Sequence, residues 1–157
     1  MDKQIKAVNR IMQTQYGLYI GITILLIVLF QSGIILEGAY AADFEMQYIL
    51  ETIGILTTIA LVPFSLKVFS MKLNKVIKEA ELQKALKLYQ YWSNVRLMIL
   101  AVVTFLNIFI YYMTLNSIGG LCALIGITAS VFCLPGEKKL REELNLVTNN
   151  EENKKEI

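Results

Sequence analysis

The sequence has no histidine, and it has only two cysteines and two prolines among 157 residues. The lack of histidine excludes imidazole acid–base catalysis and histidine-ligated metals, and two cysteines cannot supply a multi-disulfide framework. Charge is also scarce, because Asp, Glu, Lys and Arg make up 18% of the residues, whereas globular domains average about 25%. Residues 97–136 contain none of these four types. Since 55% of the residues are hydrophobic and the mean hydropathy is +0.52, the composition predicts an all-α integral membrane protein.

Four apolar segments are candidates for transmembrane helices. One crossing of a hydrocarbon core about 30 Å thick takes roughly 20 apolar residues. Two segments of 21 residues, 16–36 and 46–66, meet this length, and the second contains a single charged residue, Glu51. The uncharged stretch 97–136 is long enough for two crossings, and turn-favouring residues from Thr114 to Gly120 divide it. We therefore predict four spans in an antiparallel bundle, at about 16–36, 46–66, 95–113 and 118–134.

Basic residues are confined to one side of this predicted bundle. Segments 1–15, 67–96 and 136–157 hold three, seven and five Lys or Arg residues, which together are all fifteen in the chain. Cytoplasmic segments near span ends carry the excess of Lys and Arg, so we expect both termini in the cytoplasm. The pattern indicates a multi-pass protein of a bacterial inner (cytoplasmic) membrane. Residues 1–148 form its single domain, and the polar residues 149–157 form a disordered tail.

The N-terminal segment has a second interpretation, as a cleaved secretory signal peptide. Basic residues at positions 3, 6 and 10 precede the apolar run, which ends near Ala39-Tyr40-Ala41, a small-x-small pattern typical of a signal-peptidase site. The run is about 20 residues long, whereas signal-peptide cores have about 7–15, which favours an uncleaved span. A mature chain that begins at Ala42 would support cleavage.

Amphipathic segments continue the predicted spans on the basic side. Residues 67–94 contain no Gly or Pro, and their two apolar stripes face different directions, which predicts a cytoplasmic helical hairpin that reverses near 78–81. These extensions either pack into a small cytoplasmic bundle or lie on the anionic inner leaflet. On the leaflet, Tyr89 and Trp92 would act as membrane-interface anchors. In either arrangement, Arg96 is expected to extend to the cytoplasmic surface and place its guanidinium among lipid phosphates.

Small and polar residues mark the expected protein-facing sides of the spans, because helices in lipid associate through close approach and polar contacts. The first span has Gly17 and Gly21 as a GxxxG pair. Cys122 and Cys133 lie too far apart along a helix, at about 16 Å, to form a disulfide and are interpreted as packing residues. Projection at 100° per residue groups such residues within about 60–80° on three spans: Glu51, Gly54, Thr58 and Ser65; Arg96, Thr104, Asn107, Tyr111 and Thr114; and Gly119, Cys122, Gly126, Ser130 and Cys133.

Glu51 is the main candidate for a functional residue, because ionisable side chains within spans are rare and costly. No basic residue lies on its side of the predicted bundle, and three polar residues are expected at a compatible depth, namely Gln31, Asn107 and Tyr111. These four residues form a hypothetical outward-facing site for a cation or a proton. In the alternative interpretation, Glu51 only reaches the outer headgroups or links helices by a hydrogen bond. Asn107 by itself is more typical of a link between helices.

The sequence contains no recognisable catalytic constellation, phosphate-binding loop, metal-ligand cluster or internal repeat. We therefore expect a non-enzymatic protein without a cofactor. The leading hypothesis is an interaction or accessory subunit that acts through its cytoplasmic helical extensions. Its expected partners are the lipid bilayer and either a second copy or another membrane protein, while the basic residues flank the membrane and do not favour nucleic acid. The alternative hypothesis is a small transporter or channel that uses Glu51.

Overall fold

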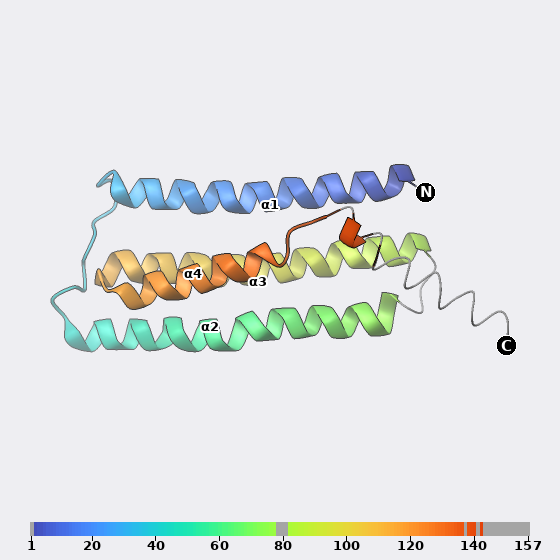
Figure 1. Cartoon of the computed structure of the whole chain (residues 1–157). Coiled ribbons are helices and arrows are strands. Elements are labelled where there is room, and N and C mark those ends of the chain that lie inside the picture. Colours follow the sequence, from blue (N-terminus) through green and yellow to red (C-terminus); the bar gives the residue numbers. More distant parts are fainter. Residues whose placement is uncertain (1, 78–81, 137, 141, 143–157) are drawn as a thin grey trace.

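The computed structural model describes residues 2–77, 82–136, 138–140 and 142, and most of these residues are helical (Figure 1). No strand occurs in these ranges, which confirms the prediction of an all-helical protein. The chain reversal expected near 78–81 and the tail 149–157 lie outside the described residues. The helices are α1 (Asp2–Gln31), α2 (Phe44–Lys72), the short π-helix η1 (Leu73–Ile77) that continues α2, α3 (Leu82–Thr114) and α4 (Ser117–Val131).

Among the described residues, three helices are long and apolar enough to cross a membrane, and these are α1, α2 and α3. They contain 30, 29 and 33 residues, which corresponds to about 44–50 Å and exceeds the hydrocarbon thickness. Helix α4 has only 15 residues, or about 22 Å. The fourth helix was predicted to continue to residue 134, whereas α4 ends at Val131. The residue before Pro135 is restricted from the α conformation, and the Cys133 N–H instead closes a turn on the Ser130 carbonyl at 2.9 Å.

Helix α1 ends at Gln31, earlier than the predicted boundary near residue 36. Gly33 follows with φ 71°, a left-handed conformation that glycine adopts without steric cost and that ends the helix. The apolar residues after Gly33 belong to the loop 32–43. The predicted boundary was too late because hydropathy alone does not show where a helix stops. The loop ends at Asp43, whose carboxylate accepts the Met46 N–H at 3.3 Å and caps the start of α2.

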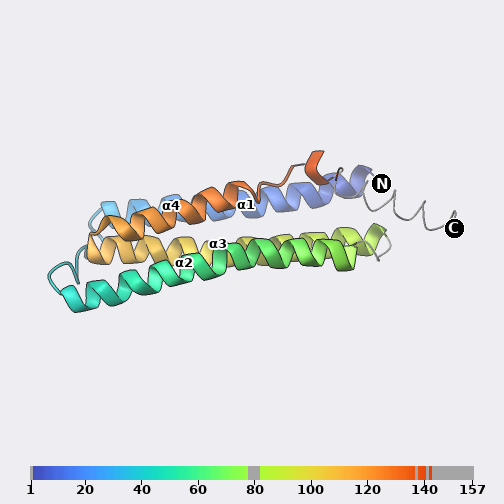
Figure 2. The ribbon, with the colours of Figure 1, turned by 60° about the horizontal axis from the view of Figure 1, so that its bottom comes forward.

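Helix α3 occupies the centre of the arrangement. It packs against α1, α2 and α4, and in Figure 1 α1 and α2 lie on opposite sides of the α3–α4 pair. Chain direction alternates from helix to helix, so that the start of α1, the end of α2 and the start of α3 lie at one end of the molecule (Figures 1 and 2). The polar residues predicted for the inner side of α3 are buried, with the exception of Tyr111, which is 37% exposed.

Glycine allows two helices to approach α3 closely. A Cβ placed on Gly54 of α2, or on Gly119 or Gly126 of α4, would come within 2.6–2.7 Å of an atom of α3. At Gly119 the nearest atoms belong to the backbone of α3, so a larger residue there requires the two helices to separate. At Gly54 and Gly126 the nearest atoms are side-chain oxygens of Asn107 and Thr104, which are buried. These glycines are packing positions of the kind that lipid-embedded helices use. The GxxxG pair of α1 differs, because among the described residues no atom outside its own helix backbone lies within 4 Å of a Cβ on Gly17 or Gly21.

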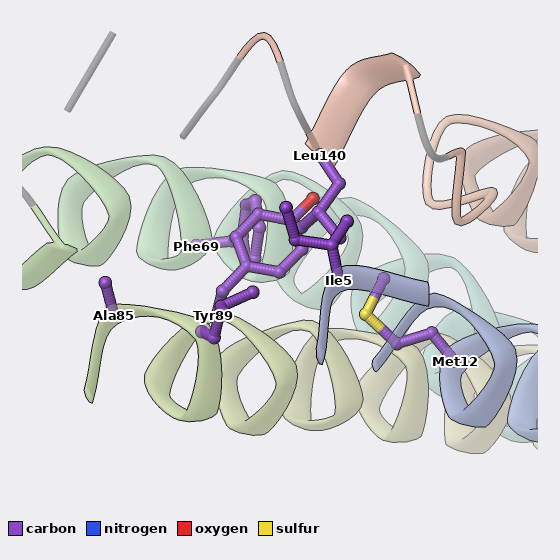
Figure 3. Packing of buried hydrophobic residues seen from close by; sticks show 7 residues of the cluster. Ile5, Met12, Phe69, Ala85, Tyr89 and Leu140 are labelled. Carbon is purple, nitrogen blue, oxygen red and sulfur yellow. The ribbon is translucent and has the colours of Figure 1, made fainter. Parts of the chain in front are cut away.

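A hydrophobic cluster joins four segments at the end of the molecule that holds the N-terminus (Figure 3). We call it the four-segment cluster, and it consists of Ile5 and Met12 from α1, Phe69 from α2, Ala85, Leu86 and Tyr89 from α3, and Leu140 from the segment after α4. All seven side chains are buried, and Leu140 is only 1% exposed. Among the described residues, these four segments therefore pack on one another at this end of the molecule.

Candidate functional site

Glu51 lies two turns after the start of α2 and is half-buried. Its Oε1 atom accepts a hydrogen bond from Nδ2 of Asn116 at 2.5 Å. Asn116 is the N-cap residue of α4, yet its side chain makes no capping bond, because it reaches α2 instead. A bond to a charged acceptor is stronger than one between neutral groups. The pair therefore connects α2 to the turn between α3 and α4 and satisfies the carboxylate without a basic residue.

The turn that presents Asn116 is unusually tight. Leu115 has φ 52°, a left-handed conformation that costs a non-glycine residue about 1–2 kcal/mol. Surrounding contacts hold it in place: the Leu115 N–H donates to the Tyr111 carbonyl at 2.8 Å, and the Leu115 side chain lies against Gly38. The Gly38 N–H in turn donates to the Tyr112 carbonyl at 2.8 Å. The loop after α1 is thereby attached to the end of α3, beside the Glu51 contact.

Asn107 is fully buried in the middle of α3 and belongs to a separate contact. Its Nδ2 atom donates to Thr58 Oγ1 at 3.0 Å and to the Val103 carbonyl at 2.9 Å. Its Oδ1 atom has no hydrogen-bond partner among the described residues and lies 2.6 Å from a Cβ built on Gly54. The amide thus fastens α2 to α3 at a point two turns, or about 10 Å, from the end of α3. Asn107 bonds to Thr58 and not to Glu51.

Tyr111 and Gln31 take part in other contacts as well. The Tyr111 ring lies beside Gly120 of α4, 3.2 Å from a Cβ built there. Gln31 is exposed at the end of α1, next to Tyr112, whose ring stacks on Phe30 at 4.5 Å between centroids. The four residues predicted to form one polar site are therefore distributed over separate contacts. Tyr111 falls between Asn107 and Thr104 on the projected arc, yet its side chain is 37% exposed and its ring lies against α4.

Thr104 adds a contact that joins α1 and α4 to α3. Its hydroxyl is completely buried, shares a hydrogen bond with the Tyr19 hydroxyl at 3.0 Å, and lies 2.6 Å from a Cβ built on Gly126. The Tyr19 hydroxyl thus makes a buried polar contact between α1 and α3. The polar side chains of α3 consequently connect it to each of its three neighbours. This use of polar groups is typical of helix association in lipid.

Two of the three predicted interface anchors, Arg96 and Tyr89, contact the ring of Phe69, and the third, Trp92, packs against the four-segment cluster. Arg96 is 6% exposed, and its guanidinium carbon lies 3.9 Å from the centroid of the Phe69 ring, a cation–π geometry. Tyr89 is buried and meets the same ring edge-on, with 5.6 Å between centroids. Trp92 is half-buried, with the Lys72 ammonium 5.2 Å from its ring. Arg96 thus differs from its predicted position at the lipid phosphates, because Phe69 offers its guanidinium a face within the protein.

No protein-family model, curated protein or solved structure matches this chain. Within the described ranges, no group of three His, Cys, Asp or Glu side chains is arranged to hold a metal ion, and both cysteines are free and buried. The polar side chains described above bond chiefly to neighbouring helices. What this arrangement supports chemically is association between helices.

Several of these contacts involve residues that the sequence pattern did not single out. Asn116 was interpreted only as a turn residue. Phe69 falls on the same projected arc as Glu51, four residues after Ser65, so extension of the predicted inner face beyond the span would have found it. Asn9 is buried within the apolar stripe of α1, and its Oδ1 atom has no partner among the described residues. Its position within an apolar stripe of the sequence could have predicted that Asn9 is buried.

Proposed function

We propose that this chain is a non-enzymatic integral membrane protein that crosses the bilayer four times, with both termini in the cytoplasm of a bacterial cell. Charge supports the orientation, because every Lys and Arg falls in segments 1–15, 67–96 and 136–157. The described parts of these segments gather at the end of the molecule that holds the N-terminus (Figure 1). Helices α1, α2 and α3 are each longer than one membrane span, so each can cross the bilayer and continue beyond it as an extension.

Helix α4 supports a fourth crossing although it is short. A hydrophobic segment shorter than the bilayer is accommodated by local thinning, at a fraction of a kcal/mol per Å. Turn residues continue the apolar segment of α4 as far as Leu134. The Lys139 ammonium then donates to the Phe132 carbonyl at 3.1 Å, which puts a cation at the carbonyl end of the helix, where its dipole favours positive charge.

The proposed role is that of an accessory or interaction subunit, and the four-segment cluster is the observation that carries it. The cluster holds the helical extensions as one packed unit, so their outward faces form a fixed surface. Tyr91 is 62% exposed on this surface. The segments that meet at this end of the molecule also carry exposed basic residues: Lys3, Lys6, Arg10, Lys84, Lys87 and Lys138. An acidic surface on another membrane protein is the complementary partner.

No specific observation on the described residues favours the transporter hypothesis. The Glu51 carboxylate is engaged by Asn116, and the amide of Asn107 by Thr58. A transport site would need these groups to be available to a cation within a shared cavity. We therefore assign Glu51 to helix association in this proposal.

Photo-crosslinking in native membranes tests the proposed role. A photoreactive phenylalanine at Tyr91 samples the extension surface, and one at Phe44, which is 83% exposed at the opposite end, is the matched control. We expect a discrete adduct with another protein, or with a second copy, from position 91 and none from position 44. Absence of adducts from position 91, or adducts from position 44 alone, contradicts the proposal.

A further inference from the structure

Two hollows lie between α1 and α3, and they differ sharply in polarity. The first has a volume of about 490 Å³, and its wall is mostly apolar: Leu18, Ile22, Met98, Ala101, Val102 and Phe105. The second has about 340 Å³ and a mixed wall, in which Gln4, Gln83, Lys87 and Gln90 stand beside Ala7, Val8 and Leu86. We call the second, which is the more polar of the two, the polar hollow.

The two hollows share one side of the helix pair. Projected at 100° per residue, the residues of α1 that line the polar hollow and those that line the apolar hollow fall on one face, and the same holds on α3. The centres of the two sets are about 17–20 Å apart along the helices. Thr14, Gln15 and Asn94 form the end of the apolar hollow that is nearer the polar one. Polarity therefore changes once along this side, from polar at the basic end to apolar toward the middle.

The apolar hollow matches one acyl chain of a lipid in length. On α3 it extends from Asn94 to Phe105, which is about 16 Å, close to one leaflet of a hydrocarbon core about 30 Å thick. Met98 is 61% exposed, so the hollow opens sideways to lipid.

The polar hollow matches an anionic headgroup. Lys87 is exposed and supplies a cation, and the glutamines supply amide donors. No acidic residue is among those that line either hollow. We infer that this side of the α1–α3 pair binds a single anionic glycerophospholipid of the cytoplasmic leaflet, with an acyl chain along Met98 and Val102 and the phosphate at Lys87. The site shares Lys87 with the surface proposed above for a protein partner.

Native mass spectrometry of the full chain in detergent, titrated with phosphatidylglycerol or phosphatidylcholine, tests this inference. We expect one phosphatidylglycerol to bind about fivefold more tightly than phosphatidylcholine, the effect of one lysine on an anionic lipid. Lys87→Gln removes this preference. Lys84→Gln removes the same charge from an exposed position three residues away that lines neither hollow, and it leaves the preference unchanged.

A second pair of variants tests the acyl-chain hollow. Met98→Trp fills the hollow from an exposed position, and we expect it to weaken the binding of both lipids at least tenfold. Leu121→Trp, on the exposed side of α4, should leave the binding of both lipids unchanged. Equal losses in the two lysine variants would indicate general surface attraction and overturn the inference. So would unchanged binding by Met98→Trp. A Met98→Trp variant that dissociates a dimer without altering lipid binding would assign the hollow to a second copy and likewise overturn it.

Discussion

Replacement of Gly119 by alanine tests the central packing contact of the molecule, between α4 and α3. A Cβ at this position would lie 2.7 Å from the Tyr111 backbone nitrogen and 3.0 Å from the Asn107 carbonyl oxygen. Both neighbours are backbone atoms of a helix, so neither can rotate away. The only relief is a separation of the two helices. Gly119→Ala therefore perturbs the helix spacing itself, and not a single side-chain position.

The size of the effect follows from these distances. Ordinary Cβ contacts begin at 3.4 Å, so the Cβ must move from 2.7 to 3.4 Å, a separation of roughly 0.7 Å. Overpacking of this kind costs about 1–3 kcal/mol. Alanine recovers up to about 1 kcal/mol through its helix propensity. The expected net loss is about 1–2 kcal/mol, or a decrease in Tm of about 2–8 °C.

Thermal unfolding in detergent, followed by circular dichroism, measures this decrease. Gly120→Ala is the adjacent control, because its Cβ would meet only the ring of Tyr111, 3.2 Å away, which is partly exposed and can rotate. Gly17→Ala is a second control, with no atom within 4 Å. Both controls should match or slightly exceed the native Tm. If Gly119→Ala is as stable as Gly120→Ala, the close approach of α3 and α4 is refuted.

Three further predictions concern the polar contacts and the topology. Glu51→Gln keeps an acceptor oxygen for its amide partner and should hold its Tm within about 2 °C, whereas Glu51→Leu should lose about 1 kcal/mol; equal losses in the two variants argue against a hydrogen-bonding role. Asn107→Ala and Thr58→Val should show a coupling of about 0.6 kcal/mol in a double-mutant cycle, because their side chains share a bond, and strict additivity contradicts that bond. Cysteine at Ser32 should react with an impermeant maleimide on intact spheroplasts, and cysteine at Lys84 only after permeabilisation, since the two positions lie at opposite ends. The opposite labelling pattern excludes the proposed orientation.

Much of the architecture could be predicted from hydropathy and periodicity. The long apolar segments predicted four spans, and among the described residues three helices, α1, α2 and α3, are long and apolar enough to cross a membrane. Helix ends were less predictable, because apolar residues continue past Gln31 and Val131, where α1 and α4 end. The polar arc of α3 was correct at Thr104 and Asn107, since a helix surrounded by neighbours must bury the polar side chains that bind them.

The candidate site was less predictable, because depth along a span does not determine which groups meet. Glu51 and Asn107 were expected to share a site, yet the partner of Glu51 is Asn116, a residue of the turn. Arg96 places its guanidinium over the ring of Phe69, a contact that the sequence pattern did not predict. Both partners lie on another helix or in a connection between helices, and their positions depend on how α2 is aligned along α3.

The order of apolar and charged residues along the chain determined that this protein is helical and suited to lipid, because transfer of a side chain between water and hydrocarbon depends on the side chain itself. Tertiary structure decided the pairing of polar groups and the packing of the extensions into the four-segment cluster. Such contacts depend on helix alignment to within about an ångström. Only the combined fit of glycines and buried side chains on all four described helices specifies that alignment.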